Sequence, residues 1–278
     1  MIFSFVCTGI LSVFGDTEGV KRTLRDQCRV TVQSFADGRL GNDMYRYLSG
    51  EGAAAHLKCN WCPPEPLVSR LRNAGLQMFH TNLPLCSSTQ WTHVQEDYPT
   101  MSPDWQAWKH IRSLRLGGYL QAWEYHGQHR TSTLLYSKSV QQACDNAVRH
   151  VCPDGADVSM HVRGGDLMQA GVLPRRDFFL PHVRGCTVVV SDSPNWVRKN
   201  LAEGVHYLQY SPAIDMCIAG SGRKIVLTAG TFDLMAAYFR KHGSAKILMD
   251  QKASWWSHVN DLEAIDRLAP KKWLHTSL

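Results

Sequence analysis

The 278-residue sequence is 44% hydrophobic and 19% charged, so it can bury one large core or two of modest size. Its formal net charge of +6 suits an anionic ligand such as a nucleotide. No run of five or more basic residues occurs, and we therefore predict that the protein has no nucleic-acid partner.

The chain begins with an apolar segment, residues 1–14, that ends shortly before Asp16. This segment is shorter than the ~20 residues that a membrane-spanning helix needs, and it lacks the basic start of a secretory signal. A truncated signal-anchor and an N-terminal strand both fit it, and we take the anchor as the expectation. Residues 1–28 are thus predicted to be an apolar segment and a linker.

The first predicted strand is 29–35, where apolar residues alternate, and a glycine-containing loop and a helix follow it. Gly38 lies in the predicted turn, Gly41 precedes Asn42 at the expected helix start, and apolar residues then recur at helical spacing. Such a loop directs backbone amides and a helix N-terminus at an anion, although a helix cap without a ligand fits as well. The pattern matches neither a Walker loop nor the three-glycine dinucleotide motif.

The middle of the chain is rich in proline, serine, threonine and asparagine, with an amphipathic helix predicted at 67–76. A strand with two glycines is predicted at 114–125, and its aromatic residues fit either a core or a platform for a sugar ring. Nine cysteines are scattered along the chain, and Cys59 and Cys62 form a CxxC motif with no second pair at zinc spacing. We therefore predict disulfides or free thiols and no metal site.

A helix is predicted at 140–151, and the Pro-Asp-Gly break at 153–155 that follows it is our candidate domain boundary. It divides the chain into an N-terminal lobe, 29–153, and a C-terminal lobe, 154–278. In the second lobe, strands alternate with short helices, which predicts a parallel sheet covered by helices. The predicted strands are 158–162, 187–190, 205–209, 224–228 and 247–249, and the predicted helices are 194–201, 213–220 and 230–240.

The strand at 158–162 ends in a charged, glycine-containing turn with the sequence HVRGGD. The turn carries His161, Arg163 and Asp166, and an arginine fork matches phosphate oxygens. The amides of Gly164 and Gly165 could approach an anion closely, although a strand and turn with surface charges fits the same residues. Open α/β sheets hold their ligands at such strand ends. A second phosphate contact is predicted where Thr231 begins a helix.

Four motifs in one order resemble the alpha-1,2-fucosyltransferases, glycosyltransferase family 11. They are GRLGN (38–42), GGYLQAW (117–123), HVRGGD (161–166) and TAGTFDLMAAY (228–238), and VVVSDSPNWVRKNL (188–201) resembles the segment between the last two. The resemblance implies an α/β fold of the GT-B type, with two facing Rossmann-like lobes that each contain a parallel sheet. It also implies inverting transfer of L-fucose from GDP-fucose to a galactose-terminated glycan, without a metal or other cofactor, at the lumenal face of the Golgi membrane.

The resemblance also assigns roles to individual residues. Arg163 would bind the donor pyrophosphate, and Asp166 is the available candidate for a catalytic base. The remaining residues would bind substrate: His161 and Gly165 in the same turn, Thr231 and Phe232 on the nucleotide side, and Gly38, Arg39, Leu40, Gly41 and Asn42 from the other lobe.

This sequence departs from the family pattern in three places. Gly164 stands where the family usually has a second arginine, and Asp233 stands where a small residue is usual. The segment between Asp166 and Val188 is short, and Pro174 disfavours a full helix there. These changes leave an alternative, a catalytically silent family member that binds nucleotide or glycan without turnover.

Overall fold

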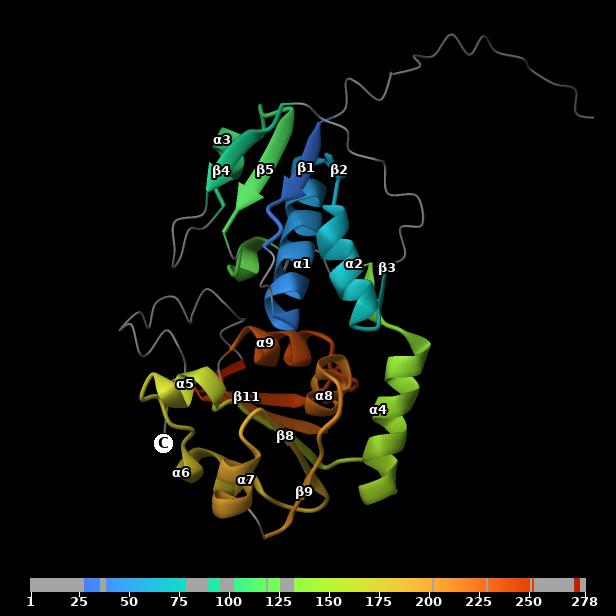
Figure 1. The fold of residues 1–278 in the computed structure, drawn as a ribbon, viewed down its shortest axis with the longest axis vertical. Coiled ribbons are helices and arrows are strands. Elements are labelled where there is room, and N and C mark those ends of the chain that lie inside the picture. The colour runs from blue at the N-terminus through green and yellow to red at the C-terminus, as the bar shows by residue number, and fades with distance from the viewer. Residues whose placement is uncertain are drawn as a thin grey trace, which may run out of the picture.

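The computed structural model describes residues 28–35, 39–78, 90–95, 103–118, 120–125, 133–201, 203–228, 230–250, 252 and 273–275. They form two lobes, stacked along the long axis in Figure 1, and each lobe contains a parallel sheet with helices beside it. The predicted α/β architecture is confirmed. Residues 1–14 and Gly38, for which we made predictions, lie outside the described residues. None of the described helices is both long and apolar enough to span a membrane.

The N-terminal sheet has the strand order β2-β1-β5-β4, and all its strands are parallel. Helix α1 (Leu40–Leu57) packs on it and is buried over most of its length, and Gly50 lets the helix approach the Trp61 ring where a larger side chain would clash. The helix starts at Leu40 and not at Asn42. The four strands are β1 (Arg29–Val32), β2 (Asn60–Trp61), β4 (Thr92–Gln95) and β5 (Ser113–Gly117).

Smaller elements complete this part of the chain. They are α2 (Glu65–Asn73), α3 (Trp105–Trp108), the 3₁₀ turn η1 (Trp123–Tyr125), and an antiparallel pair, β3 (Leu76–Met78) with β6 (Leu134–Tyr136). The single strand predicted at 114–125 is wrong in its second half. Strand β5 ends at Gly117 because the backbone turns into the left-handed region at Gly118 (φ 97°) and Leu120 (φ 55°).

The C-terminal sheet has six parallel strands in the order β12-β11-β10-β7-β8-β9. Counted within the lobe, this is the 3-2-1-4-5-6 order of a Rossmann fold, and the order reverses between β7 and β10. The central strands are buried, as their continuous apolar runs require. The strands are β7 (Val158–Val162), β8 (Thr187–Ser191), β9 (Val205–Tyr207), β10 (Lys224–Thr228), β11 (Lys246–Asp250) and β12 (Leu274–His275).

Short helices connect these strands. The predicted interruption at Pro174 is confirmed, since the residue lies in the loop between α5 and α6. The helices are α5 (Gly165–Gln169), α6 (Arg176–Phe179), the 3₁₀ turn η2 (Leu180–His182), α7 (Pro194–Asn200), α8 (Pro212–Ala219) and α9 (Thr231–Tyr238).

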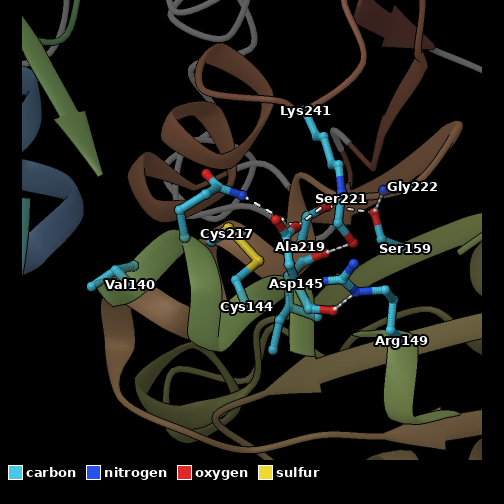
Figure 2. Close-up of a disulfide and its surroundings, with 12 residues drawn as sticks. Val140, Cys144, Asp145, Arg149, Ser159, Cys217, Ala219, Ser221, Gly222 and Lys241 are labelled. Carbon is cyan, nitrogen blue, oxygen red and sulfur yellow. Dashed lines mark hydrogen bonds and ion pairs between the residues drawn. A yellow bond between two sulfur atoms is a disulfide. The ribbon is translucent and has the colours of Figure 1, made fainter. Parts of the chain in front are cut away.

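Helix α4 (Lys138–Val151) packs along α8 and is joined to it by the disulfide Cys144–Cys217 (Figure 2). The ion pair between Lys241 Nζ and Asp145 Oδ1, 2.9 Å long, lies beside this disulfide. Thus α4 precedes the predicted boundary in the chain but is fastened to a helix of the C-terminal lobe. The division at residues 153 and 154 stays a prediction.

Two more disulfides join Cys28 to Cys59 and Cys152 to Cys186. The CxxC motif therefore does not close on itself, because Cys59 pairs with the residue that precedes β1. The disulfides that we predicted as one alternative for the cysteines are confirmed for these six. Disulfides of this number are typical of proteins that fold in an oxidising compartment.

Candidate functional site

The order of the C-terminal sheet reverses between β7 and β10, and the candidate site lies at the carboxyl ends of these two strands. Arg163 directly follows β7, and its backbone N–H donates to Oγ1 of Thr228, the last residue of β10 (3.2 Å). Parallel α/β sheets bind ligands in the crevice at such a reversal. The sheet topology therefore places the predicted arginine where a ligand is expected.

Asp166 joins two arginines from different lobes. Its Oδ1 accepts a hydrogen bond from Arg163 Nη2 at 2.6 Å, and its Oδ2 accepts one from Arg39 Nη1 at 3.1 Å. Asp192 Oδ2 lies 3.9 Å from Arg163 Nη1. Partial burial raises the pKa of the Asp166 carboxyl, but the charges of Arg163 and Arg39 outweigh it and hold that pKa below its usual value. Asp166 is therefore ionised at neutral pH and is a weak base.

The glycine turn is closed by the loop that follows β8. Gly164 N donates to Asp192 Oδ1 (2.7 Å), and Gly165 N donates to Ser193 Oγ (2.8 Å). We expected these two amides to be open to an anion, and this expectation is wrong for the structure, because side chains of the same protein already occupy them.

The same loop also fills the space beside Gly164. A Cβ atom at Gly164 would overlap Ser193 Oγ and would lie 2.6 Å from Ser193 Cβ and 2.7 Å from Met168 Sδ. An arginine, the residue usual for the family here, cannot fit unless these neighbours move.

The starts of helices α1 and α9 bring the two lobes into contact. A Cβ atom at Gly41 would lie 2.6 Å from the backbone nitrogen of Phe232, so only glycine permits this approach. Thr231 Oγ1 donates to Asn42 Oδ1 (2.8 Å), which also accepts from Gln121 Nε2 (3.3 Å). The Thr231 hydroxyl, which we expected at a phosphate, thus links the lobes. Leu40 packs against the hydrophobic core.

His161 lies below this surface in a buried polar pair. Its Nδ1 is 2.6 Å from Asp233 Oδ1, its ring packs against Phe232 with centroids 4.6 Å apart, and Thr228 Oγ1 donates to Asp233 Oδ2 (3.2 Å). Burial raises the pKa of Asp233, and the neighbouring His161 partly offsets this effect. Asp233, which we expected to add negative charge beside the phosphates, is fully buried and is bonded to His161.

Most predicted site residues therefore lie in one region at the junction of the lobes. Our interpretation of the sequence missed four residues that bond to them: Gln121, Asp192, Ser193 and Thr228. Asp192, Ser193 and Thr228 lie at or just after the ends of predicted strands, which was a usable signal because the loops at the carboxyl ends of parallel strands form the crevice. Gln121 gave no such signal, because it lies inside the strand predicted at 114–125.

Among the described residues, one group of three side chains has the spacing of metal ligands, namely Cys152, Cys186 and His206. Its two sulfur atoms are joined in a disulfide, which leaves no thiolate to bind a metal. The absence of a metal requirement stays a prediction.

Comparison with known proteins gives one significant relative in sequence. The chain is 26% identical over 241 residues to the galactoside 2-alpha-L-fucosyltransferase SEC1 of Bos taurus, in an alignment that covers 73% of this chain and 62% of the relative. The chain is thus similar in sequence to one fucosyltransferase. It spans about three fifths of the length of this relative. No family model matches the chain.

Two solved fucosyltransferase structures are also similar to it. NodZ alpha-1,6-fucosyltransferase, soaked with GDP-fucose, superposes with a TM-score of 0.49 and 12% identity, over 76% of this chain and 93% of that one. An Arabidopsis thaliana FUT1 mutant in complex with GDP gives 0.45 and 11%, over 80% and 73%. Neither superposition reaches a TM-score of 0.5. The likeness to fucosyltransferases therefore rests on the bovine relative and on this chain's own motifs.

The four motifs that resemble the alpha-1,2-fucosyltransferases gather at the junction of the lobes. Residues 39–42 begin α1, residues 161–166 end β7, and the segment 228–238 includes the last residue of β10 and all of α9. The fourth motif ends β5 at Gly117 and contains Gln121, which is bonded to Asn42. Segments far apart in the sequence thus meet at this junction, and the binding of a donor there stays a prediction.

Proposed function

We propose that the protein is a galactoside alpha-1,2-fucosyltransferase that transfers L-fucose from GDP-fucose to a terminal galactose of a glycan, with inversion at the anomeric carbon. The observation that carries this proposal is the cluster of Arg163, Asp166 and Arg39 at the reversal point of the Rossmann-ordered sheet. Each of these residues belongs to a motif that resembles the family. The alpha-1,2 linkage rests on the motifs and on the name of the bovine relative.

In this proposal the two arginines receive the charge that develops on the departing GDP. Arg163 is the more rigidly held, with its side chain 19% exposed against 61% for Arg39. A positioned guanidinium can stabilise a leaving phosphate without a metal ion. Arg39 comes from the opposite lobe and reaches the same carboxylate as Arg163, so it supplies the second positive charge that Gly164 lacks.

Asp166 holds these two guanidinium groups in place. Because its pKa is lowered, it is a weak acceptor for the proton of the galactose hydroxyl. We therefore assign it a positioning role in place of the base role for which it was our candidate. Gly41 and Asn42 would hold the lobes together beside the donor, with Thr231 and Phe232 on the other side of the contact.

We place the protein in the Golgi lumen. Three disulfides support an oxidising compartment of the secretory pathway. The type II membrane anchor proposed for residues 1–14 lies outside the described residues.

The alternative is a silent family member that binds nucleotide or glycan without turnover, and the contacts of the glycine turn favour it. Asp166 and Asp192 already neutralise Arg163, and Asp192 and Ser193 already occupy the amides of Gly164 and Gly165. A donor phosphate has to displace or share these partners.

The deciding experiment combines a GDP titration by calorimetry with product formation from GDP-fucose and lactose. For an enzyme, we expect Arg163→Ala to lower kcat/KM at least 100-fold, because a charge-assisted contact that strengthens in the transition state is lost. Arg39→Ala should weaken GDP binding roughly 10-fold, by ~1.4 kcal/mol. Arg198→Ala, an exposed change on α7, is the matched control.

The outcomes separate the candidates. GDP binding without product supports the silent protein. Product with a linkage other than alpha-1,2, determined by NMR, overturns the proposed specificity. Full activity in Arg163→Ala overturns the assigned site. A wild-type protein that binds no GDP overturns the enzyme and the silent protein that binds nucleotide.

A further inference from the structure

The N-terminal sheet ends in a row of three residues that no motif role explains. Gln95 and Gly117 are paired in register on β4 and β5, and Gln33 directly follows β1, with its N–H bonded to the carbonyl of Leu116 (2.7 Å). The two glutamines are exposed. In neighbouring parallel strands, side chains in one register row point to the same face of the sheet. Gln33 and Gln95 therefore stand on either side of a glycine.

The missing side chain of Gly117 lets the two carboxamides converge. The position that a Cβ atom at Gly117 would take overlaps Gln95 Oε1 and lies 3.1 Å from Gln33 Oε1. Any larger residue at position 117 would separate the two amides. This packing explains why the motif GGYLQAW begins with glycine at the end of β5.

The row also lies at the edge of the N-terminal sheet where α/β folds bind ligands. Gln33 directly follows β1, and Gly117 and Gln95 are the last residues of β5 and β4. Open α/β sheets bind their ligands outside the carboxyl ends of their strands.

We propose that Gln33 and Gln95 bind the terminal sugar of the acceptor, a neutral β-galactoside. This inference rests on the proposed fucosyltransferase function, and it adds the acceptor-binding residues. A carboxamide both donates and accepts hydrogen bonds, which matches the hydroxyl groups of a sugar. The two residues carry no positive charge, so they do not match a phosphate, which the arginine cluster at the junction of the lobes would take.

The sheet continues this polar surface away from the glutamines. Two residues earlier along the strands, ~7 Å away, His93 and Arg115 are paired on the same face. They line a pocket of about 770 Å³ together with Trp91 and Arg112, a size typical of small-ligand sites. Within the described residues, the buried Nε of Arg115 has no hydrogen-bond partner. An indole and guanidinium groups suit the faces and hydroxyls of further sugars, so the glycan would extend along this face.

The path from this row to the donor side is short in sequence. Strand β5 ends at Gly117, and Gln121 four residues later bonds to Asn42, which bonds to Thr231 of the other lobe. The same motif thus begins at the proposed acceptor site and ends at the contact between the lobes. A sugar bound by Gln33 and Gln95 would lie at the carboxyl ends of the strands, from which residues 117–121 run to the contact between the lobes where we propose that the donor binds.

The test uses the whole chain and measures lactose binding by saturation-transfer NMR and GDP binding by calorimetry. We expect Gln33→Leu and Gln95→Leu each to raise the Kd for lactose by 3- to 10-fold, because each removes a hydrogen-bonding group and keeps the side-chain size. GDP affinity should not change. Gln77→Leu replaces an exposed glutamine on β3 of the same lobe and is the matched control. Gly117→Ala should act like the glutamine variants, because its methyl group would displace Gln95.

Each result has one meaning. If the Kd for lactose is the same in Gln33→Leu and Gln95→Leu as in the wild type, the proposed acceptor site is overturned. Binding of GDP but not of lactose by the wild type also overturns it, and leaves the donor site intact. If the wild type binds no GDP, the proposed function is refuted. In that case, weaker lactose binding by the two glutamine variants than by the wild type would still support a saccharide site here.

Discussion

Replacing Gly164 with arginine restores the residue usual for the family, and the structure predicts that this change harms the protein. The new Cβ would overlap Ser193 Oγ and lie 2.6 Å from Ser193 Cβ, so the loop after β8 has to move. Overpacking of this kind costs ~1–3 kcal/mol, and loss of the bond from Gly165 N to Ser193 Oγ adds about 1 kcal/mol. We therefore expect the Tm to fall by roughly 4–15 °C.

The new guanidinium should not improve GDP binding while Ser193 remains. The matched change is Gly164→Arg with Ser193→Gly, which removes the overlapping side chain and should recover part of the lost Tm. Thermal unfolding and GDP calorimetry on the two single variants and the double variant form a double-mutant cycle. A Gly164→Arg protein with wild-type Tm and 10-fold tighter GDP binding would show that the space beside Gly164 opens easily, and would refute this reasoning.

Two further predictions concern stability. Replacing Cys144 and Cys217 with alanine opens a cross-link between residues 73 apart in sequence, and we expect urea unfolding to show a loss of ~4 kcal/mol; a loss below ~1 kcal/mol would contradict the chain-entropy estimate. His182, whose Nδ1 lies 2.9 Å from Lys224 Nζ, has its pKa lowered by burial and by the charge of Lys224. The pKa of His182 in the folded protein thus lies below the unfolded value near 6.5. The contribution of His182 to the free energy of unfolding is therefore present above about pH 6.5 and is lost as the pH falls, because the unfolded chain binds the proton more readily. His182→Gln should therefore lose less stability than the wild type between pH 7.5 and 5.5, and an identical loss would rule this contribution out.

The sequence allowed the C-terminal sheet to be predicted closely. Apolar runs bounded by glycine and proline residues predicted the ends of five of its strands to within about two residues. It did not allow β12 to be predicted, since this two-residue strand follows a long interval in the chain. In the N-terminal lobe, β2 and β4 lie at the edges of the sheet. Strand β2 is only two residues long, and three of the four residues of β4 are exposed and polar, so neither shows a strand period.

The residues of the candidate site could be predicted from the sequence, whereas most of the contacts between them could not. Arg163, Asp166 and Arg39 were found from motifs, and their convergence depends on the topology of two lobes. The contacts of Gly164 were not predictable, because Ser193 lies 29 residues away and meets it only through the pairing of β7 with β8. The sequence pattern suggested that the amides of Gly164 and Gly165 are open to an anion. Because β7 pairs with β8, these amides are instead bonded to Asp192 and Ser193.

Charge balance at the junction of the lobes decides how a donor could bind there. Two arginines, Arg39 and Arg163, face two carboxylates, Asp166 and Asp192, so the cluster is neutral when all four groups are ionised. A pyrophosphate brings at least two negative charges to this neutral cluster, and the attraction becomes large only if a carboxylate moves away. Asp192 is the weaker partner, because it is 3.9 Å from Arg163 whereas Asp166 is 2.6 Å from it. Donor binding at this cluster therefore requires the loop after β8 to release Arg163, and a loop that stays closed would keep GDP from binding there.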